Sequence, residues 1–131
     1  MYNLTIHENA ETDLLGLFTS EPVAAARFAV LLQEIGDSQE LLGCLLEKGF
    51  GADRSEEFNV DKWVARWRKG EDIWRLKDWE LEGLRLNYRV IYAYHIKDRC
   101  FHILAIVPRS FNYEENSPIS KRIFADYLDL T

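Results

Sequence analysis

The sequence predicts an α+β fold, because helical and strand patterns occupy separate parts of the chain. Apolar residues at helical spacing fill most of residues 13–49, whereas residues 73–113 are rich in β-branched and aromatic residues with turn residues at intervals. We predict a small antiparallel sheet, made of an N-terminal strand and a C-terminal three-strand meander. The sheet packs against N-terminal helices, a C-terminal helix closes the chain, and the helices are gathered on one side of the sheet.

Length and composition fit one domain. The chain has 131 residues, of which 47% are hydrophobic and 13% aromatic, and this is enough to bury a core. We therefore predict a single domain over residues 1–131.

The N-terminal part is predicted to form a strand and two helices. Residues 2–7 alternate as a strand does, and polar residues then lead into a helical segment over residues 13–18. Ser20 followed by Pro22 is typical of an N-cap with proline in the first helical turn. The apolar stripe that follows ends before Gly36, so the second helix is expected to be amphipathic.

A third helix and a loop follow. Asp37, with Glu40 three positions later, resembles a capping box, and the leucines after it run to Gly49, where glycine would end the helix. Residues 49–57 are predicted to form a loop. Residues 58–70 carry a brief strand pattern as well as tryptophans at helical spacing, and we predict a short helix there.

The C-terminal part is predicted to form the meander and the last helix. Turn residues near positions 82–83 and 97–98 divide residues 73–113 into three antiparallel strands. Ser117 and Pro118 then open a helix.

Cysteine usage and hydropathy argue against several classes of protein. Cys44 and Cys100 lie within apolar patterns, as buried reduced thiols do, and no histidine or cysteine spacing predicts a metal site. No apolar run is long enough to span a membrane, and the first residues lack the features of a signal peptide. We expect a cytoplasmic protein that uses no metal or cofactor and does not bind a membrane.

Charge is distributed unevenly along the chain. The net charge is −6, yet between Arg75 and Arg109 seven basic residues stand against four acidic ones, with nine basic and 18 acidic residues elsewhere. A locally basic surface on an acidic body suits a small phosphate site better than a broad groove for nucleic acid.

Cationic residues recur at matching points of the meander. Arg75 and Lys77 are two positions apart, so they project from the same face of a strand. Arg89 opens the next strand, and Arg109 and Tyr113 follow the end of the third. These side chains converge if the strands are neighbours. In the alternative interpretation, they form only the solvated face of a sheet.

The segments WRLK, NYRVIYAY and FHILAIVPR, followed by Tyr113, resemble the RelE/HigB-like toxins of bacterial type II toxin–antitoxin systems, whose superfamily includes ParE-like toxins. The resemblance is strongest over residues 73–113. It implies a RelE-like domain and a metal-independent endoribonuclease that cleaves mRNA, in many members at the ribosomal A site. It also implies a cognate antitoxin as partner. The acidic composition and an additional segment over residues 41–69 depart from the family.

The resemblance assigns roles to particular residues. In the family, one strand carries two basic residues spaced by one, the next carries arginine after an aromatic residue, and the last ends in arginine with a tyrosine beyond. By this match Lys77, Arg89, Arg109 and Tyr113 are catalytic candidates, and Arg75 binds substrate. We add Trp74 as a substrate-binding aromatic residue, with Trp79 and Phe111 as further stacking candidates.

Metal-free RNA cleavage explains these residue types. Attack of a 2′-hydroxyl on its phosphodiester needs proton removal, charge stabilisation at phosphorus and proton delivery to the 5′ oxygen. Arg89 and Arg109 suit the second task, because guanidinium binds phosphate through two hydrogen bonds. Tyr113, with its pKa lowered by nearby arginines, or Lys77 would be the base. Tyr113 could instead stack on a nucleobase.

Two other functions remain open. In the second hypothesis the protein has the same fold but is ParE-like, a non-enzymatic inhibitor of DNA gyrase. In the third hypothesis the protein is a non-toxic interaction domain, whose acidic N-terminal helices bind a basic partner.

Overall fold

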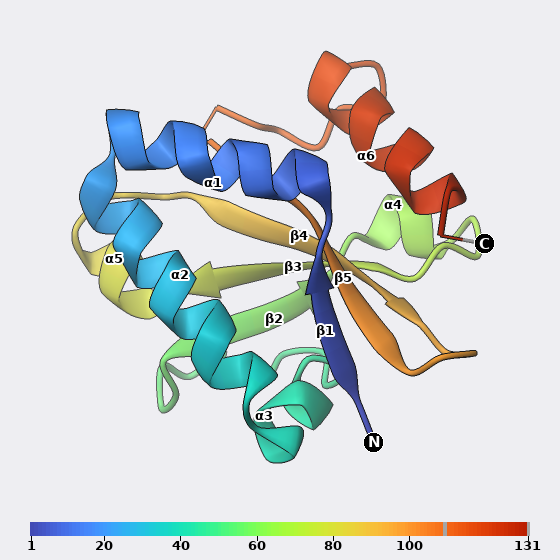
Figure 1. The fold of residues 1–131 in the computed structure, drawn as a ribbon, viewed down its shortest axis with the longest axis horizontal. Helices are drawn as coiled ribbons and strands as arrows, with labels where there is room; N and C mark the ends of the chain where they lie inside the picture. Colours follow the sequence, from blue (N-terminus) through green and yellow to red (C-terminus); the bar gives the residue numbers. More distant parts are fainter. Residues whose placement is uncertain (109, 131) are drawn as a thin grey trace.

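A computed structural model describes residues 1–108 and 110–130. In chain order the elements are β1 (Asn3–Ile6), α1 (Glu8–Ser20), α2 (Pro22–Gly36), α3 (Gln39–Cys44), β2 (Phe58–Lys62), α4 (Val64–Trp67), β3 (Ile73–Asp78), α5 (Trp79–Gly83), β4 (Arg89–His95), β5 (Cys100–Val107) and α6 (Pro118–Leu128). The predicted α+β class and the meander β3–β4–β5 are confirmed (Figure 1).

The sheet is mixed, and this corrects the purely antiparallel prediction. Its strands lie in the order β1-β5-β4-β3-β2. β1 pairs with β5 in parallel, while every other neighbouring pair is antiparallel. The cause is the path of the chain: the helices after β1 return it to the far edge, where β2 begins, and the meander then runs back until β5 lies beside β1.

A strand replaces part of a predicted helix. Phe58–Lys62 forms β2, antiparallel to β3, and only Val64–Trp67 is helical within the segment for which we predicted a helix. The strand forms because Phe58 and Val60 are buried on one face, while polar residues alternate with them. A helical turn, α5, also occupies the predicted turn after β3.

Three helix starts differ from the predictions. The first helix, α1, begins at Glu8, five residues before the predicted start at Asp13. Ser20 is the last residue of α1, and Glu21 is the N-cap of α2, although Pro22 is in the first turn as expected. At α3 the N-cap is Ser38 in place of Asp37, because the Ser38 Oγ accepts a hydrogen bond from Leu41 N at 3.1 Å.

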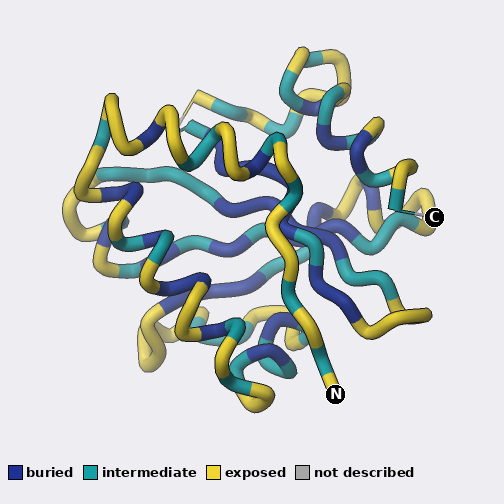
Figure 2. The backbone as a smooth tube through the Cα atoms, in the orientation of Figure 1, coloured by how far each residue is buried: buried dark blue, intermediate teal, exposed yellow. Residues whose placement is uncertain are grey.

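Helices cover both faces of the sheet. On one face, α1, α2 and α3 bury a core that includes Phe28, Tyr92 and Phe101. On the other, α6 packs through Ile123 over β5, in a cluster with Trp63. The prediction of helices on one side is therefore wrong for α6. Buried segments concentrate in the central strands, whereas the outer sides of the helices are exposed (Figure 2).

No helix in residues 1–108 and 110–130 is long and apolar enough to cross a bilayer. Cys44 and Cys100 are both free thiols.

Candidate functional site

Three cationic side chains lie on the face of the sheet that also carries α6. Arg75 and Lys77 alternate with the buried residues Trp74 and Leu76, which belong to the opposite core. The β3–β4 register pairs Leu76 with Val90, so the next position on each strand places Lys77 beside Arg89. We name Arg75, Lys77 and Arg89 the cationic cluster. These three residues thus share one face of the sheet, although the two arginine side chains are each paired with a carboxylate, Arg75 with Asp61 and Arg89 with Glu82.

Arg75 is the most enclosed member of the cationic cluster. Its side chain is 18% exposed, and its Nη1 donates a hydrogen bond to Asn59 Oδ1 at 2.8 Å. Its Nη2 lies 3.7 Å from Asp61 Oδ2, a looser ion pair. Burial lowers the pKa of Arg75, which nevertheless stays charged at any physiological pH. Asn59 and Asp61 on β2 therefore fix this guanidinium.

Arg89 is held by a carboxylate from α5. Its Nη1 donates to Glu82 Oε2 at 2.6 Å and its Nη2 to Glu82 Oε1 at 3.2 Å. The same Nη1 also donates to the carbonyl oxygen of Tyr88 at 3.0 Å. The fork that would bind a phosphate is therefore occupied by Glu82.

Lys77 differs from both arginines. Within the described part of the chain its ammonium forms no ion pair, and its nearest aromatic partner is Trp79, whose ring centroid lies 4.7 Å from Nζ. Burial lowers the pKa of Lys77, and the positive charges of Arg75 and Arg89 lower it further. A lysine in this state gives up its proton more readily than an exposed one.

Tyr113 lies near the cationic cluster, in the segment between β5 and α6. Its ring packs edge-on against Trp63 and Phe111, with centroid separations of 5.2 and 4.8 Å. Its backbone has φ +64°, a left-handed conformation that is strained for a bulky residue. The aromatic contacts offset that strain and fix the ring.

The expected activation of Tyr113 is wrong. Burial raises the pKa of its phenol, and the opposing effects of Arg75 and Arg89 are smaller. Tyr113 is therefore a poorer base than free tyrosine. It keeps its proton at neutral pH and can donate it or stack on a base.

Trp74 does not belong to this site. It is 3% exposed on the opposite face, stacks on Tyr92 and donates its indole N–H to Asp72 Oδ1 at 2.6 Å. The predicted substrate contact is incompatible with that position, because adjacent strand residues point to opposite faces. Arg109 lies outside the described residues.

Sequence reasoning missed three partners of the cationic cluster, namely Asn59, Asp61 and Glu82. The alternation in residues 58–62 was a usable signal for the first two, because it places both on the face of Arg75. No sequence pattern indicated Glu82, since its position depends on the helical turn α5.

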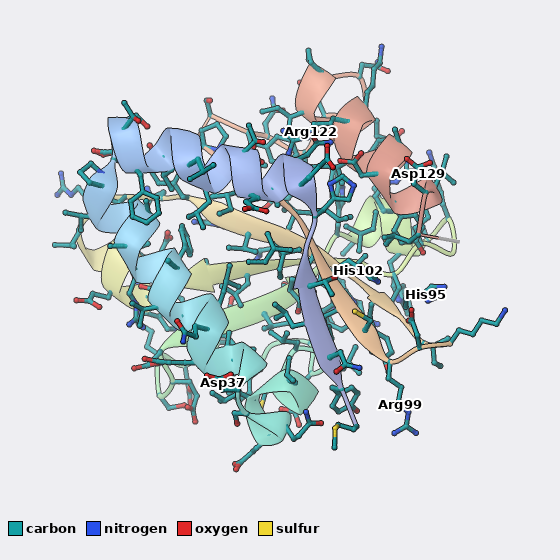
Figure 3. The ribbon with its side chains drawn as sticks, viewed as in Figure 1. Asp37, His95, Arg99, His102, Arg122 and Asp129 are labelled. Carbon is teal, nitrogen blue, oxygen red and sulfur yellow. The ribbon has the colours of Figure 1, made fainter. Side chains whose placement is uncertain are left out.

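The histidines of the meander lie away from the cationic cluster, near the β4–β5 turn, whereas Arg89 is at the other end of β4 (Figure 3). His95 Nδ1 is 2.8 Å from Asp98 Oδ1, and His102 Nδ1 is 3.0 Å from Thr5 Oγ1. Among the described residues no group of three or more His, Cys, Asp or Glu side chains could hold a metal ion.

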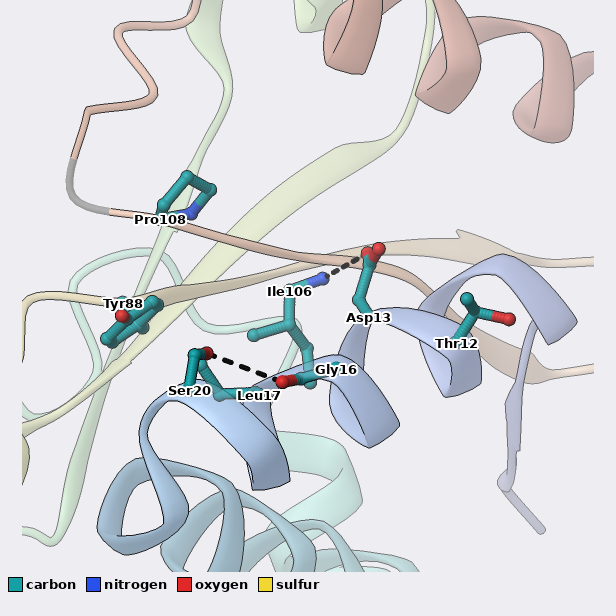
Figure 4. Close-up of a pocket in the computed structure, with 8 residues that line it drawn as sticks. All are labelled: Thr12, Asp13, Gly16, Leu17, Ser20, Tyr88, Ile106 and Pro108. Carbon is teal, nitrogen blue, oxygen red and sulfur yellow. Dashed lines mark hydrogen bonds between the residues drawn. The ribbon is translucent and has the colours of Figure 1, made fainter.

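A cavity of about 370 Å³ lies elsewhere, between α1 and the adjoining ends of β4 and β5 (Figure 4). The charged residue in its lining, Asp13, already binds Arg122 at 2.6 and 2.9 Å and accepts from Ile106 N at 3.0 Å. Tyr88 and Ile106 in its wall belong to the α1–α3 core. The cavity is thus on the face opposite the cationic cluster, and the described residues that line it offer no cation to a phosphate.

Compared with protein-family models, with curated proteins and with solved structures, the chain has no significant match. Function is therefore inferred from the geometry of the cationic cluster and from the resemblance over residues 73–113.

Proposed function

We propose that this chain is a RelE-like toxin of a type II toxin–antitoxin system, an endoribonuclease that cleaves mRNA through attack of the 2′-hydroxyl. The single observation that carries the proposal is the position of Lys77, an ammonium without a carboxylate partner in the described chain, beside two arginines. Asp61 and Glu82 offset the charges of Arg75 and Arg89, so one positive charge of the three remains uncompensated, and a bound phosphate would supply the missing negative charge.

Each member of the cationic cluster has a task in this reaction. Arg75 and Arg89 hold the phosphate and stabilise the charge that develops on it. Lys77, with its lowered pKa, is the better candidate for accepting the 2′-hydroxyl proton. Tyr113, which retains its proton, delivers one to the 5′ oxygen or stacks on a base. The resemblance gives Arg109 the same task as Arg89.

The proposed partners are mRNA, the ribosome and a cognate antitoxin that masks the site. These partners are implied by the resemblance to the RelE/HigB-like toxins. The acidic body of the protein favours a positioned substrate over free RNA, because net negative charge opposes binding of long polyanions.

The Arg89–Glu82 pair favours a second candidate, the ParE-like inhibitor of DNA gyrase. If the protein is such an inhibitor, Arg89, whose two terminal nitrogens are already bound by Glu82, has only a structural role, and no RNA is cleaved.

Inducible expression tests the proposal. We expect growth arrest with new mRNA 5′ ends, both lost in Lys77→Ala and Arg109→Ala but kept in Arg99→Ala, whose arginine lies in the turn between β4 and β5. Arrest with intact mRNA would favour the gyrase inhibitor. Normal growth would favour the interaction domain.

A further inference from the structure

The loop between α3 and β2 is fixed along the outer edge of β2, close to the cationic cluster. Gly49 N donates to Val60 O at 2.9 Å, and Val60 N donates to Phe50 O at 3.1 Å. Gly51 passes so close to the Phe58 carbonyl that a Cβ would lie 2.0 Å from its oxygen, and its φ is +71°. Only glycine fits there, which holds the loop against the strand.

Asn59 joins this loop to the cationic cluster. Its Nδ2 donates to Phe50 O at 2.8 Å, while its Oδ1 accepts from Arg75 Nη1 at 2.8 Å. Trp79 makes a second connection, because its indole N–H donates to Gly51 O at 2.7 Å. The loop and the cationic cluster therefore form one surface.

Trp79 also contacts two cations. The Cζ of Arg54, in the loop, is 4.4 Å from the ring centroid, and the Nζ of Lys77 is 4.7 Å from it. The charge of Arg54 contributes to the lowered pKa of Lys77, so the two groups are within electrostatic reach of each other. The positive charge of the cationic cluster thus continues through Trp79 to Arg54.

Arg54 is exposed and carries no ion pair within the described residues. The acidic neighbour Asp53 is engaged elsewhere, because its Oδ1 accepts from the backbone N and the Oγ of Ser55 at 3.1 and 2.6 Å. Arg54 has φ +65°, and its N donates to Gly51 O at 3.0 Å. The side chain is thus presented at a defined turn, with its guanidinium against an indole, and its guanidinium N–H groups form no hydrogen bond to the described residues.

We propose that Arg54, positioned by Trp79, forms an accessory phosphate subsite for the nucleotide next to the cleaved phosphodiester of a single-stranded RNA. This subsite rests on the proposed function and extends it to a substrate longer than one phosphodiester. A guanidinium stacked on an indole keeps its N–H donors available in its own plane, so it binds phosphate while the stack persists. Basic grooves bordered by aromatic rings are the general means of tracking single strands.

Non-cleavable RNA tests the subsite. 2′-O-methyl oligonucleotides lack the nucleophile, so binding of a dinucleotide and of a hexanucleotide is measured by fluorescence anisotropy without cleavage. The variant is Arg54→Gly, which removes the side chain at a backbone conformation that glycine favours. The matched control is Arg99→Gly, because Arg99 is also exposed and has φ +51°.

Arg54→Gly should weaken hexanucleotide binding severalfold, lower the slope of log affinity against log salt by about 0.7, and leave dinucleotide binding unchanged. Arg99→Gly should change neither affinity. Unchanged hexanucleotide binding in Arg54→Gly, together with weaker binding of both probes in Lys77→Ala, would overturn the subsite and leave the proposed function standing. If the native chain binds neither probe, the subsite fails, while the proposed function is still tested by mRNA cleavage at the ribosome. If the native chain binds the probes and Lys77→Ala has no effect on binding, both proposals fail.

Discussion

The Glu82 carboxylate binds both terminal nitrogens of the Arg89 guanidinium, at 2.6 and 3.2 Å. Both side chains are largely buried, at 14% exposed for Glu82 and 22% for Arg89. A phosphate that uses the same fork must displace this carboxylate, so Glu82 controls how strongly the cationic cluster attracts an anion.

Glu82→Gln should therefore raise the affinity for a non-cleavable oligonucleotide and lower stability by about 1–2 kcal/mol, because a largely buried guanidinium loses its counter-ion. Anisotropy titration and urea unfolding measure the two effects. Glu80→Gln, on the same helical turn but 69% exposed, is the control. If affinity is unchanged in Glu82→Gln, Arg89 does not contact phosphate.

Asn59→Ala removes the residue that connects the loop to Arg75. It deletes the hydrogen bonds to Phe50 and Arg75, so we expect a loss of about 2 kcal/mol in the free energy of unfolding, together with reduced cleavage. The exposed Asn112→Ala provides a comparison, and its effect should stay within about 0.5 kcal/mol. Equal stability of the two variants would show that the Asn59 contacts contribute nothing.

The lowered pKa of Lys77 gives stability a defined pH dependence. The native state binds this proton less tightly than the unfolded chain, so the protonated lysine opposes folding below its native pKa. This destabilisation of the native state is lost as the pH rises towards the pKa that lysine has in the unfolded chain. Lys77→Met should therefore gain stability relative to the native chain at about pH 7, and the gain should shrink towards about pH 10. Urea unfolding at both pH values checks this.

Lys97→Met, in the exposed β4–β5 turn, controls for the loss of one positive charge. A Lys77→Met gain that grows with pH would mean that the pKa of Lys77 is raised, contrary to the geometry of the cationic cluster.

Tyr113→Phe separates the nuclease from the gyrase inhibitor. The ring contacts with Trp63 and Phe111 remain, so stability should change by less than about 0.5 kcal/mol. Loss of the hydroxyl should slow RNA cleavage, whereas a gyrase inhibitor would keep its toxicity. Growth assays and mRNA end mapping on the same cultures measure both. Full toxicity and full cleavage together would exclude the hydroxyl from the reaction.

The sequence predicted those features that depend on local periodicity. Alternation in residues 73–95 placed Arg75, Lys77 and Arg89 on one face, and the Ser117–Pro118 pair marked the start of α6 correctly. The same alternation places Trp74 on the opposite face, and its choice as an aromatic stacking residue did not take this into account. Where alternation was applied to every residue of a strand, it predicted correctly which face of the sheet each side chain occupies.

Features that depend on tertiary packing were not predictable. The parallel pairing of β1 with β5 depends on the path of the chain through the helices. The ion pair between Glu82 and Arg89 depends on how α5 folds back on β4. Burial of Tyr113 reverses the effect of two nearby arginines on its pKa, and no sequence pattern gives that balance.

Cleavage of a defined mRNA by the purified chain, in a translating extract, tests the central claim most directly. We predict products with 5′-hydroxyl ends, because attack of the 2′-hydroxyl expels the 5′ oxygen. Cleavage should slow about 100-fold in Arg89→Ala and in Lys77→Ala, but not in Arg99→Ala. Products with 5′-phosphate ends would contradict attack by the 2′-hydroxyl. Rates unchanged in Arg89→Ala and Lys77→Ala would contradict a phosphate held by the cationic cluster.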